Sequence, residues 1–545
     1  MKINFLVAQL ESNVGEFELN YKKIKNAYLE AEKKDYDFFV STELALSGYP
    51  PKDLLLRDDF IKTSQLFLQR LENLTERKKC HLCVGTPFEL GGELFNSLMI
   101  LKNGKIIQRI DKTILPNYGV FDEKRYFKPS RGFTNLLSYK KRKICFLVCE
   151  DFWDNKFVEK VINVRPDVIV VVNASPFEKA KYQERIKLAK NISEKSGSMI
   201  IYSNLSNAQD DLIFDGGSFC MLKNKKIINQ APFFQESKLE ICFPSEKQLY
   251  SNEKNSKVIS NVYMALVYSL RKYLKRTGFK KVLIGISGGI DSALCATIAC
   301  DSLGSKNVLG YILPSKYTSD ESILDSKKLA ENLNMKLTNL NIEDIVNLYK
   351  TNLKPIFKDL PEDLTEENLQ SRIRGVILMA LSNKFNQLLI ATGNKSELAV
   401  GYSTLYGDMC GGFSLLKDVY KTEVFELANW RNINKSSFFL LKKKKLIPKN
   451  IIVKEPTAEL KENQKDSDSL PPYDILDKIL NYLIDQKLSV KDIQDKGFKE
   501  ELINKVWVML KKSEFKRYQS SIGPKISNMN FDNDRRFPIV NDYKL

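Results

Sequence analysis

The pattern of apolar and polar residues along positions 1–245 predicts a mixture of strands and amphipathic helices. Short apolar runs bounded by turn residues indicate buried strands, and longer stretches with apolar residues three and four positions apart indicate helices. The expected helices include 16–32 and 182–195. The expected strands are 5–8, 38–41, 81–84, 97–101, 105–110, 144–148, 168–172, 199–203 and 218–222. This arrangement favours a sandwich of α and β layers over a doubly wound sheet.

The pattern changes in the second half, where apolar strands alternate regularly with helices. After a helix expected over 262–275, strands are expected from 281 and at 308–313, 336–341 and 388–392, with helices up to 333 and over 368–386. This is the rhythm of a parallel sheet. Residues 246–258 are polar and lack periodicity, and residues 460–474 are expected to form a loop. We therefore predict one domain over 1–245, a linker over 246–262 and a second domain over 263–545.

The composition is that of an ordinary soluble protein. The 545 residues are too many for one core, and 43% are hydrophobic and 28% charged. No apolar run reaches about 20 residues, so no membrane partner is expected, and the first residues indicate a strand rather than a signal peptide. Nine cysteines are too few for a disulfide scaffold, which favours a reduced, cytoplasmic protein.

The net charge of +18 is compatible with nucleic acid, with a small polyanionic substrate or with a lysine-rich surface. The longest lysine run, 442–445, has no interleaved aromatic residues, and no nucleic-acid-binding motif is present. We therefore expect solvated surface lysines first and phosphate-bearing substrates second, with no nucleic-acid partner.

The chain has a single histidine, His81. A Ser-His-Asp or Cys-His mechanism could use only this residue, and a histidine-rich metal site is excluded. The segment Cys80-His81-Leu82-Cys83 alternates into a strand and is expected in the core, with a zinc site as the alternative. A nucleophile in this chain is therefore expected to depend on Glu or Lys for activation.

A glycine-rich turn joins the strand at 281–286 to a helix. Ser287-Gly288-Gly289 lets the backbone approach a phosphate closely, and the N–H groups at the helix start favour negative charge. Asp291 would repel a bare phosphate, which suggests a bridging Mg²⁺. The lysine of a Walker A loop is missing. The alternative is an ordinary glycine-rich turn between a strand and a helix.

This turn resembles the pyrophosphate loop of ATP pyrophosphatases, which split ATP between its α and β phosphates. The resemblance implies that ATP is a co-substrate and that Mg²⁺ is the cofactor. The residues implied to bind ATP here are Gly285, Ile286, Ser287, Gly288, Gly289, Ile290, Asp291 and Ser292.

Three segments of the first half place a reactive side chain beside a predicted strand or turn: Ser41-Thr42-Glu43, Asp111-Lys112-Thr113 and Val148-Cys149-Glu150. Alone, each would be interpreted as a core cysteine or a surface charge. Together they resemble the nitrilase superfamily, whose members hydrolyse C–N bonds. The resemblance implies a catalytic triad of Glu43, Lys112 and Cys149.

The residue types fit such chemistry. A thiol must lose its proton to attack an amide, so Glu43 would act as the general base and Lys112 would stabilise the oxyanion. The same resemblance implies that Glu123 supports the triad. It also implies glutamine binding by Tyr118, Ser175 and Lys181, for which packing and solvent exposure are the alternatives.

Polar segments of the second half, at 367–375, 391–408, 417–422, 456–460, 470–473 and 514–517, extend the resemblance. With the phosphate loop they resemble the glutamine-dependent NAD synthetases over nearly the whole chain. The resemblance implies ATP contacts by Thr392 and Lys421, and Mg²⁺ ligation by Asp291 and Glu397. The residues that it implies for deamido-NAD are Asn368, Glu397, Asp408 and Lys516.

The expected fold class is therefore α/β, with a nitrilase-like α-β-β-α sandwich followed by a Rossmann-like parallel sheet. The expected reaction is ATP-dependent amidation of deamido-NAD with ammonia from glutamine, and the family implies a homo-oligomer. Two alternatives stay open. One is another ATP pyrophosphatase amidotransferase that uses glutamine, and the other is a non-catalytic fusion of a nitrilase-like scaffold with a nucleotide-binding module.

Overall fold

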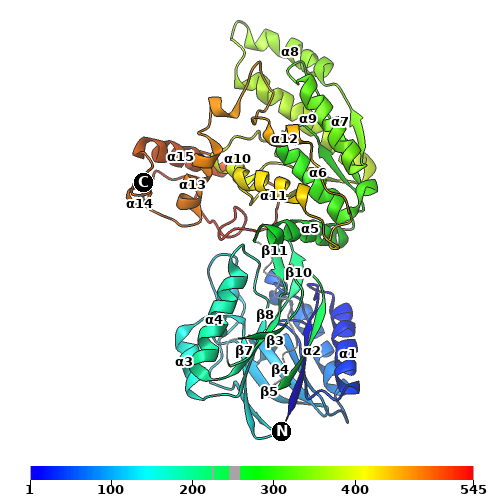
Figure 1. Ribbon diagram of the computed structural model, residues 1–545, viewed down its shortest axis with the longest axis vertical. Coiled ribbons are helices and arrows are strands. Elements are labelled where there is room, and N and C mark those ends of the chain that lie inside the picture. The colour runs from blue at the N-terminus through cyan, green and yellow to red at the C-terminus, as the bar shows by residue number, and fades with distance from the viewer. Residues whose placement is uncertain (1, 224–225, 245–257, 544–545) are drawn as a thin grey trace. The chain divides into compact units, whose positions relative to one another are not determined.

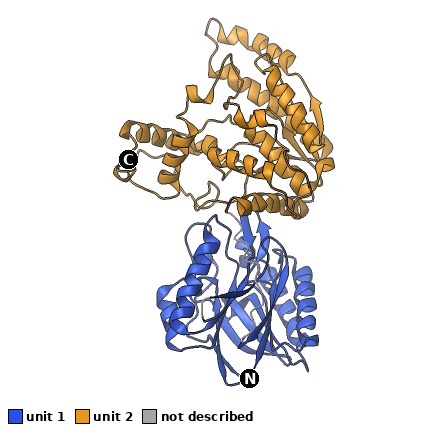
Figure 2. Cartoon of the chain, viewed as in Figure 1, with its two compact units in different colours: residues 1–256 blue, residues 257–545 orange. Residues whose placement is uncertain are grey.

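The computed structural model describes residues 2–223, 226–244 and 258–543. The chain divides into two compact units, Met1–Ser256 and Lys257–Leu545 (Figure 2). Most of the expected linker lies outside the described residues. Its last part is helical, because helix α5 (Val258–Thr277) begins before the helix start expected at 262.

The described part of unit 1 contains two six-stranded sheets (Figure 1). The first has the order β14-β1-β2-β3-β4-β5, with β1 (Ile3–Gln9), β2 (Phe38–Val40), β3 (His81–Leu90), β4 (Glu93–Lys102), β5 (Lys105–Asp111) and β14 (Ser237–Phe243). The second has the order β13-β12-β9-β8-β7-β6, with β6 (Leu136–Tyr139), β7 (Arg142–Val148), β8 (Val168–Asn173), β9 (Met199–Asn204), β12 (Phe219–Met221) and β13 (Ile227–Gln230). Strands β10 (Ser206–Gln209) and β11 (Leu212–Asp215) form a separate pair.

Successive side chains of a strand point to opposite faces of its sheet, so each sheet can bury one apolar face against the other sheet and one against helices. Phe5 and Val7 of β1 belong to a core that also contains Val170 of β8, and therefore lie between the two sheets. Leu6, between them in the chain, belongs to another core that also contains Ile24 of helix α1.

Helices cover the outer faces of both sheets. Helices α1 (Phe17–Lys33) and α2 (Asp58–Leu74) pack on the first sheet, while α3 (Asn155–Asn163) and α4 (Lys181–Ser196) pack on the second. The order of layers is α-β-β-α, so the expected sandwich is confirmed.

The sequence pattern missed or shortened several elements of unit 1. Strand β3 runs to Leu90 instead of residue 84, although Pro87 opposes strand formation, because its second half pairs with β4 in one long hairpin. Strand β14 was missed because it alternates apolar and charged residues (Lys238, Glu240) and is completed only by pairing with β1, far away in the sequence. The strands β6, β10, β11 and β13 were not predicted, and no ranges were predicted for the helices α2 and α3.

Unit 2 contains a five-stranded sheet among its described residues, with the order β17-β16-β15-β18-β19 and parallel pairing throughout. The strands are β15 (Val282–Gly285), β16 (Val308–Ile312), β17 (Lys336–Asn339), β18 (Leu388–Ala391) and β19 (Phe413–Ser414). The expected parallel sheet is therefore confirmed. Because β16 and β18 flank β15 on opposite sides, the strand order reverses at β15, and open parallel sheets bind ligands at such a point.

Helices surround this sheet and continue to Arg517, after which residues 518–543 contain no helix. Those of the sheet region are α6 (Ile290–Leu303), α7 (Asp320–Leu333), α8 (Glu343–Phe357), α9 (Leu364–Phe385), α10 (Lys395–Val400), α11 (Lys421–Ile433) and α12 (Lys449–Val453). The later ones are α13 (Tyr473–Ile484), α14 (Val490–Gln494), α15 (Glu500–Lys512) and α16 (Glu514–Arg517). The segment expected as a loop to residue 474 enters α13 at Tyr473. No helix of the described segments is long and apolar enough to cross a membrane.

His81 is buried in unit 1, where its ring stacks on Phe38 at 4.5 Å and Nδ1 lies 2.9 Å from the carbonyl oxygen of Asp37. Burial lowers its pKa from 6.5 to about 4. Between these pH values the unfolded chain binds a proton that the folded chain excludes. Acidification from pH 6.5 to 4 should therefore cost unit 1 about 3 kcal/mol of folding free energy through this residue.

The single histidine makes this prediction directly measurable. Its ring proton resonances should titrate with a midpoint near 4, and His81→Asn should flatten the fall of unfolding free energy between pH 6.5 and 4. A midpoint at the ordinary histidine value would contradict the buried environment.

Candidate functional sites

The first site is built around Lys112, which follows strand β5. Its side chain is fully buried, and Nζ lies 2.8 Å from Glu43 Oε1 and 2.8 Å from Glu123 Oε1. Burial opposes the charge, but Glu123 and Glu43 together outweigh it and hold the pKa of Lys112 well above its ordinary value. Lys112 is therefore a permanent cation that can stabilise negative charge but cannot act as a base.

Glu43 is held from three sides. Its Oε1 accepts hydrogen bonds from Lys112 Nζ and from Asn96 Nδ2, both at 2.8 Å, and its Oε2 accepts one from the backbone N–H of Ala174 at 2.9 Å. These donors come from different strands or strand ends, which fix the carboxylate in one orientation.

Cys149 lies at the turn that ends β7. Its backbone φ of 45° is left-handed, an uncommon conformation for a residue with a side chain, which the surrounding structure must enforce. Burial raises the pKa of the thiol well above its ordinary value; Glu43 raises it further, and Lys112 opposes both. The thiol is therefore neutral at rest, and among these charged groups Glu43 is the available acceptor for its proton. The structure thus brings the three expected triad residues together.

Asp151 joins the parts of this site, and the sequence reasoning missed it. Its Oδ1 accepts the backbone N–H groups of Thr113 and Ile114 at 2.9 and 2.8 Å, directly after Lys112. Asp151 itself lies two residues after Cys149 in the same short turn. The only sequence signal was a carboxylate in the Cys149-Glu150-Asp151 turn.

The residues expected to bind glutamine fall into two groups. Tyr118 is 58% exposed and donates to Glu150 Oε1 at 2.9 Å, while Lys181 Nζ lies 4.4 Å from the ring centre of Trp153. Glu150, next to Cys149, was not predicted. Glu150 supplies a carboxylate beside the thiol, and Lys181, which also lies 3.2 Å from Glu184 Oε2, supplies an ammonium over Trp153; an amino acid carries these two charges.

Ser175 belongs to the second group and is buried rather than open to solvent. Its hydroxyl accepts from Arg185 Nε at 3.2 Å, and its backbone N–H donates to Asn204 Oδ1 at 2.9 Å. Arg185 is itself paired with Asp215 at 2.7 Å. Ser175 follows Ala174, whose backbone N–H donates to Glu43. The contacts of Ser175 with Arg185 and Asn204 therefore fix the backbone beside Glu43.

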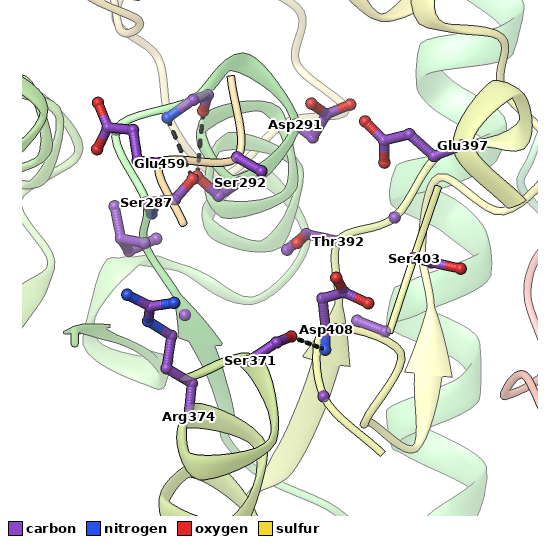
Figure 3. A pocket seen from close by; sticks show the side chains of 18 of the residues that line it. Ser287, Asp291, Ser292, Ser371, Arg374, Thr392, Glu397, Ser403, Asp408 and Glu459 are labelled. Carbon is purple, nitrogen blue, oxygen red and sulfur yellow. Dashed lines mark hydrogen bonds between the residues drawn. The ribbon is translucent and has the colours of Figure 1, made fainter. Parts of the chain in front are cut away.

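The second site is a cavity of about 310 Å³ in unit 2, at the carboxyl ends of β15, β16 and β18. All the residues expected to bind ATP line it: Gly285, Ile286, Ser287, Gly288, Gly289, Ile290, Asp291, Ser292, Thr392 and Lys421. Figure 3 shows Ser287, Ser292, Thr392 and the two carboxylates Asp291 and Glu397 around this space.

The conformation of the Ser287-Gly288-Gly289 turn follows from local constraints. Gly288 has φ +82°, and a Cβ there would lie 2.6 Å from the backbone oxygen of Ser322, so the position admits only glycine. The Ser287 and Ser292 hydroxyls are 3.2 Å apart, and the Ser287 hydroxyl accepts the Gly289 N–H. Helix α6 starts directly behind this turn, which concentrates N–H donors and hydroxyls at its N-terminus.

Asp291 and Glu397 converge on one ammonium group. Lys421 Nζ lies 2.5 Å from Asp291 Oδ2 and 3.0 Å from Glu397 Oε1. Burial raises the pKa of Glu397 to about 7, and Lys421 opposes this shift. Burial disfavours the charge of Lys421, yet the two carboxylates outweigh it and raise its pKa. Asn394 Nδ2 donates to Asp291 Oδ1 at 2.8 Å.

A buried carboxylate outside the cavity lining, Asp477 of α13, ties these two segments together. It accepts the Ser396 hydroxyl at 2.5 Å and the Thr422 N–H at 2.8 Å, and so links the residues next to Glu397 and Lys421. No local pattern indicates this role, because Asp477 lies more than fifty residues further along the chain than Thr422.

The residues expected at the deamido-NAD side gather around the segment 401–408. Asp408 lines the cavity, its N–H donates to Ser371 Oγ at 3.0 Å (Figure 3), and burial raises its pKa to about 6. Asn368 accepts from Thr404 Oγ1 at 2.8 Å, and Lys516 donates to the Ser403 carbonyl at 2.7 Å. Asn368 and Lys516 flank the cavity through this segment rather than lining it.

Arg374 of α9 also lines the cavity and was not predicted. Its Nε donates to the Leu313 carbonyl at 2.9 Å, and burial lowers the pKa of its guanidinium to about 10. In Figure 3 Arg374 lies on the side of Ser287, opposite to Asp291 and Glu397.

Comparison with known proteins agrees with this division. Residues 7–241 match the carbon–nitrogen hydrolase family, and residues 262–520 match the NAD synthase family. The fold and sites thus define an enzyme that combines a carbon–nitrogen hydrolase domain with an NAD synthase domain.

Similarity to curated proteins extends over the full length. The chain is 41% identical to the glutamine-dependent NAD(+) synthetase of Acinetobacter baylyi over 99% of this chain and 98% of that protein, and 40% identical to that of Synechocystis over 98% of each. A solved glutamine-dependent NAD+ synthetase from Acinetobacter baumannii, in complex with ADP, matches with a TM-score of 0.79 at 38% identity, covering 100% and 99% of the two chains. The chain belongs to the glutamine-dependent NAD(+) synthetase family.

The position of Lys112 between two buried carboxylates predicts a large effect on stability. Lys112→Met leaves Glu43 and Glu123 without their cation and should lower the unfolding free energy of unit 1 by about 3–5 kcal/mol. Urea unfolding can be followed by the fluorescence of Trp153, the one tryptophan of unit 1, with Trp430 and Trp507 replaced by Phe. Adding Glu123→Gln should recover part of the loss; no recovery would contradict the charge-based explanation.

Proposed function

We propose that the chain catalyses the reaction of deamido-NAD, ATP, glutamine and water to give NAD, AMP, pyrophosphate and glutamate. The observation that carries this proposal is the presence, in one chain, of a buried Glu-Lys-Cys cluster and of a phosphate loop at the switch point of a parallel sheet. We further propose that residues 1–245 are the glutaminase and residues 263–545 the synthetase.

In the first unit, Glu43 takes the proton of the Cys149 thiol as the sulfur attacks the side-chain amide of glutamine. Lys112, which stays charged, stabilises the tetrahedral oxyanion. Glu43 then returns the proton to the leaving ammonia, and water hydrolyses the Cys149 thioester to release glutamate. Tyr118, Ser175, Lys181 and the neighbouring Glu150 hold the amino acid.

In the second unit, the phosphate loop and Thr392 bind ATP, while Asn368, Glu397, Asp408 and Lys516 bind deamido-NAD. The nicotinate carboxylate attacks the α-phosphorus of ATP, and pyrophosphate leaves. Ammonia then attacks the acyl carbon, AMP leaves with the electron pair of the broken C–O bond, and the amide loses its extra proton. Backbone N–H groups and hydroxyls of the loop stabilise the charge that develops on the phosphates.

Asp291 and Glu397 fit a Mg²⁺ ion, because their oxygens already converge on one cationic group, the Lys421 ammonium. In the described segments no group of three or more His, Cys, Asp or Glu side chains is arranged to hold a metal. Mg²⁺ commonly takes one or two carboxylates and completes its shell with phosphates and waters, which agrees with this pair. When bound, Mg²⁺ would neutralise phosphate charge.

Two further proposals concern the setting of the enzyme. Its nine free cysteines support a reduced compartment, the cytoplasm. Large apolar side chains are exposed on α8 and α9, such as Ile356 at 70%, Leu364 at 64% and Val376 at 66%. We propose that a further copy of the chain covers them in a homo-oligomer.

Removal of the thiol separates the two half-reactions. Cys149→Ala should abolish NAD formation driven by glutamine and keep NAD formation driven by ammonium, since only the first needs the nucleophile. NAD formation from deamido-NAD, ATP and Mg²⁺ measures both. If the wild-type chain forms no NAD with either nitrogen donor, the proposed function is wrong.

Removal of one carboxylate in unit 2 should impair NAD formation and spare glutamine hydrolysis. Asp291→Asn should lower NAD formation with both nitrogen donors by about two orders of magnitude, while glutamine hydrolysis continues, because electrostatic support of the phosphates is lost. Asp320→Asn, an exposed carboxylate in the first turn of α7, is the control and should leave both activities unchanged. Equal activity of Asp291→Asn and the control would remove Asp291 from the site.

A further inference from the structure

The cavity of unit 2 contains a cation with no role in the steps above, the ammonium of Lys454. Lys454 follows helix α12 and lines the cavity. Its Nζ donates to Ser322 Oγ at 2.7 Å and lies 3.2 Å from Glu459 Oε1, and its side chain is only 20% exposed. The ammonium is therefore held in place rather than free in solvent.

Ser322 places this ammonium beside the phosphate loop. The backbone of Ser322 packs so closely on Gly288 that a Cβ there would lie 2.6 Å from the Ser322 oxygen. Lys454 is bonded to the hydroxyl of the same serine. Its positive charge thus lies next to the Ser287-Gly288-Gly289 turn, where the phosphates are proposed to bind.

Glu459 fixes the other side of the ammonium. Its Oε1 also accepts the hydroxyls of Ser319 and Ser322, both at 2.8 Å, which anchors the carboxylate on the first turn of α7. The third contact of Lys454 Nζ, to Ser319 Oγ, is 3.5 Å long and therefore weak. The ammonium has three N–H donors, directed to Ser322, Glu459 and Ser319, so an arriving phosphate oxygen would replace the weak contact to Ser319.

Lys454 is one of three cationic side chains among the residues that line the cavity, with Lys421 and Arg374. Lys421 is already neutralised, since it lies between Asp291 and Glu397. Lys454 Nζ lies 3.2 Å from Glu459 Oε1 and 3.9 Å from Oε2 of Glu321, which is largely exposed, so its ion pairs are longer than those of Lys421. It stands beside the turn that would hold the β- and γ-phosphates. A departing pyrophosphate gains negative charge, and the turn itself offers only neutral N–H and hydroxyl donors.

Resting on the proposed function, we propose that Lys454 is a catalytic residue of the adenylation step that binds the β- and γ-phosphates of ATP and stabilises pyrophosphate as it leaves. As the substrate carboxylate attacks the α-phosphorus, the bond from that phosphorus to the bridging oxygen breaks, and its electron pair goes to pyrophosphate. The ammonium of Lys454 meets this growing charge. Glu459 is the positioning residue that holds Lys454 there.

The test compares the binding of two probes, pyrophosphate and AMP, to the full-length chain in MgCl₂ by isothermal titration calorimetry. AMP lacks the two phosphates that Lys454 is proposed to bind. Lys454→Met should weaken pyrophosphate binding by about 10- to 100-fold, the usual effect of losing a charged hydrogen bond, and leave AMP binding unchanged. Lys328→Met is the matched control, since Lys328 pairs with Glu331 on α7 and is 63% exposed; it should change neither.

Three outcomes would overturn the proposal. Equal losses for pyrophosphate and AMP would mean that Lys454 only maintains the cavity, and unchanged pyrophosphate binding would remove it from the site. Glu459→Gln keeps an oxygen for the serine hydroxyls but removes the opposing charge, so it should bind pyrophosphate at least as tightly as the wild type. A loss as large as that of Lys454→Met would contradict the assigned roles.

Failure of the proposed function would be recognised separately. NAD formation from deamido-NAD and ammonium, measured on the same wild-type preparation, tests that function. The pyrophosphate and AMP comparison needs no deamido-NAD, so it decides the role of Lys454 whether or not NAD is formed.

Discussion

In both units a buried lysine ammonium lies between two carboxylates, and the neighbouring reactive groups are arranged around that contact. Lys112 bridges Glu43 and Glu123, and Lys421 bridges Asp291 and Glu397. Burying any one of these charges alone would cost several kcal/mol, and the partners offset that cost only in a narrow geometry. The folded chain therefore keeps the charged groups at each site within hydrogen-bond distance, in the low-dielectric surroundings where their fields are strongest.

The contacts that maintain these clusters come from segments far apart in the chain. Asp151 binds the backbone after Lys112, and Asp477 binds the residues beside Glu397 and Lys421. Each is a carboxylate that accepts backbone or hydroxyl donors and needs no exposure to substrate. Such residues convert the ends of separate strands and helices into one rigid site, as precise catalysis requires.

Local sequence pattern was sufficient where an element is fully buried or strongly periodic. The apolar runs of β8 and β9 and the periodic face of α1 were predicted within a few residues of their observed ends. The local pattern was insufficient to predict β14, in which charged residues alternate with apolar ones, and the second half of β3. Their strand conformation depends on pairing with distant partners, which no local window contains.

The sequence by itself determined the alternation of strands and helices in each half, the glycine turn and, by resemblance, the expected reactive and binding residues of both sites. The tertiary structure alone decided how these residues are charged and connected: that Lys112 is a permanent cation, that Ser175 is held by Arg185, and that Lys454 lies beside the turn. The reason is physical. Periodicity and turn chemistry act over a few residues, whereas burial and pairing of charge depend on which distant segments the fold brings together.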